Sequence, residues 1–238
     1  MHPIDKTKTR NRMVRAMSEA DYALLAPHLQ LRSDPKGHVL FDRDQRTDLV
    51  WFPESGIASI ISSSPVGLRT ESGLFGRDGF APVSIVMGAC QSPHMAVVQV
   101  PTECRVMPVA VLIDALSASA TLRDLLLRYA QTLFVQTSYT ALSNAVHLVE
   151  ERLARWLLMT HDRLDGNELP LTHDFLSAML AVRRPSVTAA LHRLEGERFI
   201  RAERGCIIIR DRAALEHFAR DSYGTPEAEY ERLIGPLR

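Results

Sequence analysis

Cysteine is scarce in this 238-residue chain, and its three cysteines, Cys90, Cys104 and Cys206, stand far apart. No CxxC pair or similar spacing is present, so the sequence predicts neither a disulfide framework nor a metal site. Long apolar runs are missing as well, and no stretch approaches the ~20 residues of a transmembrane helix. The basic N-terminus lacks the apolar core of a signal peptide. We therefore expect a cytoplasmic protein without membrane contacts, and no pattern calls for a cofactor.

Charge of one sign is not in excess, because 28 Lys and Arg residues balance 28 Asp and Glu residues. A neutral chain is not a general nucleic-acid binder, so any such role needs a local concentration of positive charge. One segment near the C-terminus has this concentration. Its arginines outnumber its glutamates: Arg183, Arg184, Arg193, Arg198, Arg201 and Arg204 against Glu195, Glu197 and Glu203.

The familiar catalytic signatures are also missing. The chain contains no G-x-S-x-G elbow, no H-E-x-x-H helix and no phosphate-cradling G-x-x-x-x-G-K loop. Each of these patterns places a nucleophile, a metal or a phosphate where its chemistry requires it. Their absence argues against an enzyme.

Residues 36–108 carry short runs rich in Val, Ile and aromatic residues, separated by turn signals such as Pro53-Glu54-Ser55-Gly56 and Gly76-Arg77-Asp78-Gly79. Such spacing predicts an antiparallel barrel or sandwich. Before it, residues 1–12 are polar and basic and predict a loose arm. Ser18 and Asp21 then resemble the start of a capped short helix. At this length, two domains are expected.

Residues 120–150 predict one long helix, since they contain no Gly or Pro. Side chains along it recur at alternating steps of three and four, as in a heptad repeat. We expect this stripe either to pack on the chain's own barrel or to form a two-helix dimer seam. The stripe comprises Leu126, Tyr129, Leu133, Gln136 and Thr140.

Residues 171–200 read as two helices joined by a tight turn. Thr172 stands at the N-cap position of the first helix, and Pro185 lies in the first turn of the second, where it is well tolerated. A hairpin with Arg204-Gly205 at its turn follows, in the place of a wing. This arrangement suits a recognition helix in the DNA major groove, although an ordinary antiparallel helix pair has the same local pattern.

The combination resembles the Crp–Fnr family of bacterial transcription regulators from about Met17 to Tyr223. The motifs that carry the resemblance are Val149-Glu150-Glu151-Arg152-Leu153-Ala154-Arg155-Trp156-Leu157-Leu158, Glu168-Leu169-Pro170-Leu171-Thr172-His173-Asp174-Phe175-Leu176 and Val182-Arg183-Arg184-Pro185-Ser186-Val187-Thr188. The resemblance implies an α+β fold with three parts. These are a jelly-roll (double-stranded β-helix) barrel over residues 1–118, a long dimerisation helix over 119–147 and a winged helix-turn-helix over 148–238.

The resemblance further implies a dimer that binds double-stranded DNA at a pseudo-palindromic operator and contacts RNA polymerase. Arg184 stands where a family arginine donates to guanine O6 and N7, the commonest specific base contact. The family's following Glu and second Arg are replaced here by Pro185 and Ala189. The remaining candidate DNA contacts are Thr172, Arg183, Ser186, Thr188, His192 and Arg204.

The effector region departs from the family. Members that bind cyclic nucleotide hold its phosphate with an Arg-Ser or Arg-Thr pair, but His94 and Met95 stand there in this chain. Neither side chain offers the charged donor fork of arginine, which argues against cyclic AMP. Gly79, His94 and Met95 mark the expected effector pocket, and the effector itself stays unidentified. The alternative function is a ligand- or protein-interaction module with weak or vestigial DNA binding.

Overall fold

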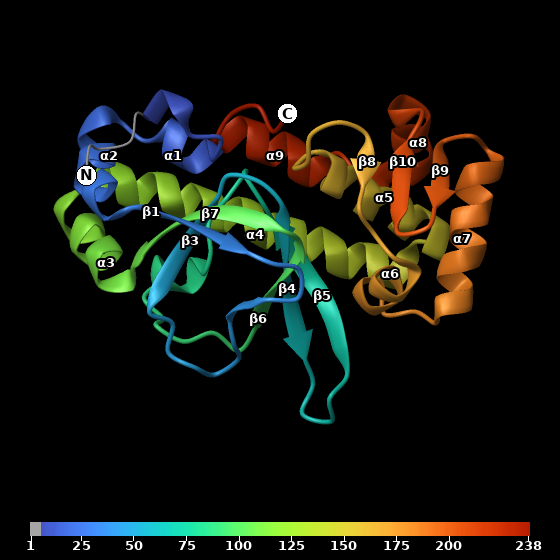
Figure 1. Ribbon diagram of the computed structural model, residues 1–238, viewed down its shortest axis with the longest axis horizontal. Coiled ribbons are helices and arrows are strands. Elements are labelled where there is room, and N and C mark those ends of the chain that lie inside the picture. The colour runs from blue at the N-terminus through green and yellow to red at the C-terminus, as the bar shows by residue number, and fades with distance from the viewer. Residues whose placement is uncertain (1–5) are drawn as a thin grey trace.

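The computed structural model describes residues 6–238 and has the mixed helix and sheet architecture that the sequence predicts (Figure 1). The N-terminal part opens with short helices: η1 (Lys6–Lys8), α1 (Arg12–Ala16), α2 (Glu19–Leu25) and η2 (Ala26–His28). The strands and one short helix of the barrel follow: β1 (Gln30–Asp34), β2 (Val39–Phe41), β3 (Leu49–Pro53), β4 (Ile57–Ser63), β5 (Arg69–Phe75), η3 (Val83–Ile85), β6 (Met95–Val100) and β7 (Thr102–Pro108).

Two antiparallel sheets form this barrel, with strand orders β1-β7-β3 and β2-β6-β4-β5. An apolar core lies between them and includes Phe41, Trp51, Phe75 and Val98. Neither sheet could bury its inner face alone, so the two faces cover each other. This arrangement confirms the predicted antiparallel barrel and is consistent with a jelly roll.

Residues 6–16 correct the expectation of a loose arm, whose first five residues lie outside the described part. Asn11 is fully buried, and its side-chain amide donates to the carbonyl oxygens of Pro53 at 2.9 Å and Gly79 at 2.8 Å. Its Oδ1 accepts from the Val14 amide and so caps α1. The polar composition of this segment gave a wrong prediction, because its polar groups form hydrogen bonds with buried backbone atoms rather than with water.

The long helical segment divides into α3 (Val109–Ala118), α4 (Ala120–Val146) and α5 (Val149–His161). The predicted continuous helix thus breaks at His147 and Leu148. The Glu151 carboxylate accepts from the Leu148 amide at 2.9 Å and satisfies the new N-terminus. In Figure 1, α4 runs from the barrel side of the molecule to the second domain.

The predicted stripe of α4 faces the interior of its own chain. Leu126 is 0%, Tyr129 2%, and Leu133 and Gln136 each 7% exposed. Tyr129 packs on Phe80, and the Gln136 Oε1 accepts from the Leu74 amide of β5 at 2.8 Å. Thr140 is half-buried and donates to the Gln136 carbonyl oxygen. Of the two alternatives for this stripe, the structure shows the first, because Leu126, Tyr129, Leu133 and Gln136 pack on the barrel of their own chain.

The second domain is built on α5. It comprises β8 (Glu168–Leu169), α6 (His173–Met179), α7 (Arg184–Gly196), β9 (Ile200–Glu203), β10 (Cys206–Ile209), α8 (Arg212–Ala219) and η4 (Arg220–Ser222). Its strands pair in the order β8-β10-β9. The β9–β10 hairpin, with Gly205 at a φ of 77°, confirms the predicted wing turn.

A last helix, α9 (Thr225–Leu233), was not predicted from the sequence. It leaves the second domain and packs along α4, as Figure 1 shows. Tyr230 is buried, and its hydroxyl donates to the Asp78 carbonyl oxygen at 2.7 Å. Residues 225–238 therefore contact the barrel side of the molecule, although the sequence-based division places them with the second domain. No helix among residues 6–238 combines the length and hydropathy required to cross a membrane.

Candidate nucleic-acid interface

Helices α6 and α7 form a helix-turn-helix whose geometry follows from local capping. The Thr172 side chain accepts from the Phe175 amide at 3.3 Å and begins α6. The turn contains Ala181 at a φ of 51°, a left-handed conformation that lets the chain reverse in few residues. Pro185 lies in the first turn of α7, where the missing N–H needs no partner.

One face of α7 is buried against the domain core. Val187, Ala190, Leu191 and Leu194 are each at most 1% exposed and pack in the same core as Trp156. This spacing orients the opposite face to solvent. The outward ridge of α7 comprises Pro185, Ala189, His192 and Gly196, all exposed.

Arg184 stands at the start of α7 with a side chain that is 63% exposed. Its Nε lies 3.2 Å from the Asp174 Oδ1 of α6, and the Asp174 side chain is 74% exposed. An ion pair so open to water contributes at most about 1 kcal/mol and is easily exchanged. The guanidinium is therefore available to a stronger anionic or base partner in front of α7.

Two predicted contact residues have their hydroxyls engaged within the motif. The Thr188 Oγ1 donates to the Arg184 carbonyl oxygen at 3.2 Å and lies 3.1 Å from the His173 Nδ1. Thr172 uses its hydroxyl oxygen as the cap of α6 but stays exposed. Both side chains stabilise the motif, and Thr172 retains a proton for an external acceptor.

Arg183 and Arg204 are exposed at the two edges of this surface. Arg204 lies in the wing turn. Arg183 lines a groove of about 810 Å³ between the helix-turn-helix and the β4–β5 hairpin, together with Leu68 and Val182. The structure thus separates Arg183 from the outward ridge of α7. Arg193 also lies exposed on α7, where it pairs with Glu197 at 3.1 Å, although its side chain was not among the predicted contacts.

A cavity of about 460 Å³ lies between the barrel and α4, where the effector pocket is expected. Of the three predicted pocket residues, His94 lines it, whereas Gly79 and Met95 do not. A Cβ at Gly79 would lie 1.8 Å from the Tyr129 hydroxyl, so this glycine is required for close packing against α4. Met95 instead begins β6 and pairs with Ile61.

The lining of this cavity does not fit a cyclic nucleotide. It contains hydroxyls, one imidazole and one amide but no arginine or lysine. A buried phosphate requires a cationic or dense N–H donor set to offset its desolvation. His94 is already engaged, because its Nδ1 lies 3.2 Å from the Ser62 hydroxyl.

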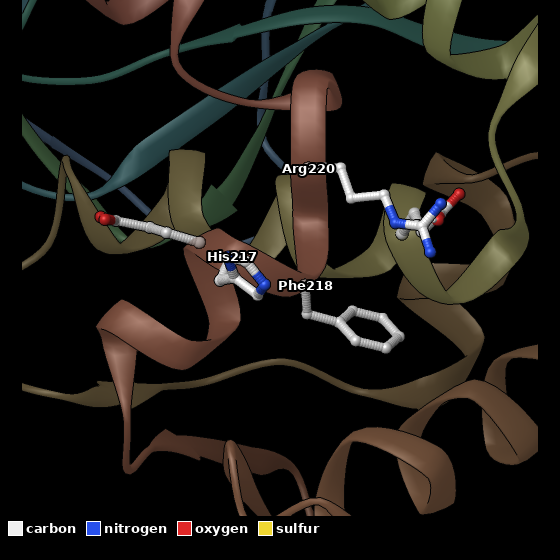
Figure 2. Close-up of a pocket in the computed structure, with 5 residues that line it drawn as sticks. His217, Phe218 and Arg220 are labelled. Atoms are coloured by element: carbon white, nitrogen blue, oxygen red, sulfur yellow. Dashed lines mark ion pairs between the residues drawn. The ribbon is translucent and has the colours of Figure 1, made fainter.

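A further hollow lies between α5 and α8 (Figure 2). Its lining residues are Glu151, Glu216, His217, Phe218 and Arg220, and Arg220 pairs with Glu151 at 3.4 Å. The figure shows Phe218 and Arg220 reaching out from the same chain segment. Among the residues that the structure describes, no hydroxyl or thiol side chain lines this hollow.

The barrel and the second domain meet through buried polar contacts. The Trp156 Nε1 donates to the Glu71 Oε1 at 2.7 Å, and the Ser59 hydroxyl also donates to this carboxylate. Burial raises the pKa of Glu71 to about 7, against the opposing effect of these hydrogen bonds. Beside them, Arg163 and Asp78 form a buried ion pair at 2.8 Å. The candidate DNA-reading helices are thus attached to the barrel of the same chain.

Comparison with known families supports the reading of the second domain. A family model described as the Crp-like helix-turn-helix domain matches residues 151–218, which run from the start of α5 to the end of α8. No curated relative matches the chain in sequence.

Three solved structures share the fold over about four fifths of this chain. FixK2 from Bradyrhizobium japonicum is 16% identical, with 80% of this chain and 96% of that chain covered and a TM-score of 0.69. TTHB099, a Crp-family transcriptional regulator from Thermus thermophilus, is 16% identical, with 79% and 96% covered and a TM-score of 0.64. The c-di-GMP-responsive regulator CLP from Xanthomonas campestris is 16% identical, with 81% and 99% covered and a TM-score of 0.63.

Proposed function

We propose that this chain, which has the Crp/Fnr-type regulator fold and carries a Crp-like helix-turn-helix domain, is a dimeric, sequence-specific transcription regulator. The observation that carries the proposal is the exposure of Arg184 and of the outward ridge at the start of a helix buried on its other face. A helix presented in this way can enter a major groove. As a transcription regulator, the protein would also contact RNA polymerase.

The proposal includes a dimer of two copies of the chain, and the exposed face of α4 supports this part of it. One stripe on this face alternates in steps of four and three, and every member is exposed. Its members are Leu127, Gln131, Phe134, Ser138, Ala141 and Ala145. This is the spacing of a coiled-coil seam, and small residues let two helices approach closely. Phe134, 67% exposed, would stand near the centre of the seam.

The chemistry of α7 also suggests what kind of half-site is read. Arg184 can donate to guanine O6 and N7, whereas the short side chains of Pro185 and Ala189 can contact a thymine methyl. His192 can donate to or accept from a base edge. Two-fold symmetry would place two such half-sites about one helical turn apart. Arg204 in the wing suits a backbone phosphate.

The deciding experiment selects bound sequences from random DNA with the purified full-length protein and then measures affinity for the selected site. Arg184→Ala should weaken specific binding by about 1–3 kcal/mol and relax one base position. Arg204→Ala should weaken specific and random DNA alike and reduce the salt slope by about one. Arg232→Ala, on α9, is the matched control with unchanged affinity. Failure to enrich any sequence, with no salt-dependent affinity, would overturn the proposal.

The alternative, a ligand- or protein-interaction module with vestigial DNA binding, draws on one observation. Arg184 already has a carboxylate partner in Asp174. Asp174→Asn separates the two functions. In a DNA-binding regulator this substitution should increase the affinity for DNA, because it removes the carboxylate that competes for Arg184 and a negative charge near the DNA phosphates. In an interaction module it should leave the negligible DNA affinity unchanged.

A further inference from the structure

The cavity between the barrel and α4 is large enough for a small molecule. Its volume of about 460 Å³ falls within the ~300–1,000 Å³ of ligand pockets. Its wall is formed by Phe41 of β2, the strands β4 and β5, the segment over residues 80–94 and one face of α4. The segment over residues 80–94 supplies most of the wall, and the strands and α4 supply the rest.

The wall is mainly apolar. Phe41, Phe80 and Val83 line it from the barrel, and Leu133 and Phe134 line it from α4. Among residues 6–238, no Asp, Glu, Lys or Arg lines the cavity. A charged ligand would therefore lose its hydration without gaining an ionic partner.

Among the described residues, seven with polar side chains line the cavity, and these supply hydroxyls, one amide and one imidazole: Ser62, Ser72, Ser84, Ser92, Thr137, Gln91 and His94. The Ser72 hydroxyl donates to the Ile60 carbonyl oxygen, and Ser62 pairs with His94. The Ser84 hydroxyl is buried and has no hydrogen-bond partner among residues 6–238. Thr137 gives the wall a hydroxyl on α4, which suits one or two hydrogen bonds to a ligand.

We propose that this cavity binds an uncharged, largely apolar small molecule with one or two hydrogen-bonding groups, and that it rejects phosphate-bearing ligands. The absence of cationic side chains from the lining carries the proposal. The shape of the cavity alone would admit many ligands. An anion would be excluded because its desolvation costs free energy that no cationic side chain in the lining offsets.

The cavity also touches the proposed dimer seam. Phe134 lines the cavity and lies in the exposed stripe of α4, so one ring borders both. A ligand beneath this ring would change how it packs against the second copy. This regulatory consequence rests on the proposed function, whereas ligand binding itself does not.

Two fluorescent probes that differ by one charged group test the chemistry. N-phenylnaphthylamine is uncharged and apolar, and anilinonaphthalene sulfonate has the same ring system with an added sulfonate. We expect saturable binding of the uncharged probe to the full-length protein at one site per chain. The sulfonated probe should bind at least about tenfold more weakly, and cyclic AMP should not displace the uncharged probe. Equal or tighter binding of the sulfonated probe, or displacement by cyclic AMP, would overturn the proposal.

Substitutions in the wall locate the bound probe. Ala130→Phe fills the cavity from α4, and Ser72→Leu narrows it from β5, so each should lower probe affinity at least about tenfold. Ala120→Phe, exposed at the start of the same helix, is the matched control. Urea unfolding verifies that each variant folds. If both wall variants fold and retain full affinity, or if no saturable site exists, the cavity is not the site.

Probe binding is measured without DNA, so this result is independent of the proposed function. If the protein binds the uncharged probe in the cavity but enriches no DNA sequence, the proposed ligand site stands and the proposed regulator function is wrong. If the protein enriches a DNA sequence but its probe binding does not respond to the wall substitutions, the proposed regulator function stands and the proposed ligand class is wrong.

Discussion

The indole of Trp156 donates a 2.7 Å hydrogen bond to the buried carboxylate of Glu71 and thereby joins the helix-turn-helix domain to the barrel. Trp156 lies on α5 and Glu71 on β5, and both are at most 4% exposed. The apolar core of the second domain extends across the same junction, because Ile57 and Leu74 of the barrel belong to it. The position of the candidate DNA-reading helix therefore depends on contacts within one chain.

The first prediction concerns pH. The folded state raises the pKa of Glu71 from 4.5 to about 7, so between these values it holds a proton that the unfolded chain has lost. The free energy of unfolding should therefore fall as pH rises through this window, by roughly 3 kcal/mol in total for this group. Glu71→Gln removes the titration but keeps an acceptor for Trp156. Urea unfolding between pH 5 and 8 should accordingly show a flatter profile for the variant.

Glu103→Gln is the control for this measurement, because Glu103 is exposed on β7. Its profile should follow that of the unsubstituted protein. Tryptophan fluorescence gives a second reading, since ionisation of Glu71 changes the charge beside the Trp156 indole. A Glu71→Gln protein with an unchanged pH profile would show that Glu71 does not titrate in this range.

The second prediction concerns the ion pair of Asp78 and Arg163, which are 2% and 4% exposed at their side chains. Asp78→Asn leaves the Arg163 cation buried without its hydrogen-bonded counter-charge, which should lower the free energy of unfolding by about 3–5 kcal/mol. Asp174→Asn is the matched control, because Asp174 pairs with Arg184 in water. The control should change stability by about 0–1 kcal/mol. Comparable losses in the two variants would contradict the structure.

The third prediction tests why Gly79 is a glycine. A Cβ there would overlap the Tyr129 ring, so Gly79→Ala should destabilise the fold by at least about 1–3 kcal/mol. Tyr129→Leu in the same chain should recover part of the Gly79→Ala loss, measured against Tyr129→Leu alone. Gly196→Ala is the control, since open space surrounds this helical position, and it should be neutral or stabilising. Unchanged stability of Gly79→Ala, together with weaker probe binding, would restore Gly79 to the effector pocket.

Sequence patterns predicted the barrel, the helix-turn-helix and the wing because each has a strong local signal. Turn residues bound the strands, Thr172 caps α6, and Gly205 closes the β9–β10 hairpin. These signals act within a few residues, and here they agree with the tertiary structure. The elements that depend on them could therefore be predicted without a structure.

The orientation of α4 could not be predicted in the same way. The buried stripe containing Leu133 and the exposed stripe containing Phe134 have the same alternating spacing, displaced by about one residue. The periodicity of the sequence shows that α4 has two such stripes. Which stripe is buried depends on the surface that packs against the helix, and this surface comes from distant parts of the chain. The last helix was missed although Gly224, Thr225 and Pro226 offer a helix start, because the core that buries Tyr230 comes from residues far away in the chain.

The final prediction tests the proposed seam on the exposed face of α4. Phe134→Glu places a charge at the centre of the stripe, where a second copy would bring a like charge opposite it. We expect the dimer to dissociate to monomers in sedimentation or light-scattering measurements, with affinity for a two-half-site operator lost and the fold retained. Arg128→Glu, exposed on α4 outside the stripe, is the matched control and should stay dimeric. If the dimer instead persists in Phe134→Glu and dissociates in Arg128→Glu, the seam lies on another face, because a desolvated like-charge pair cannot be accommodated in a packed helix interface.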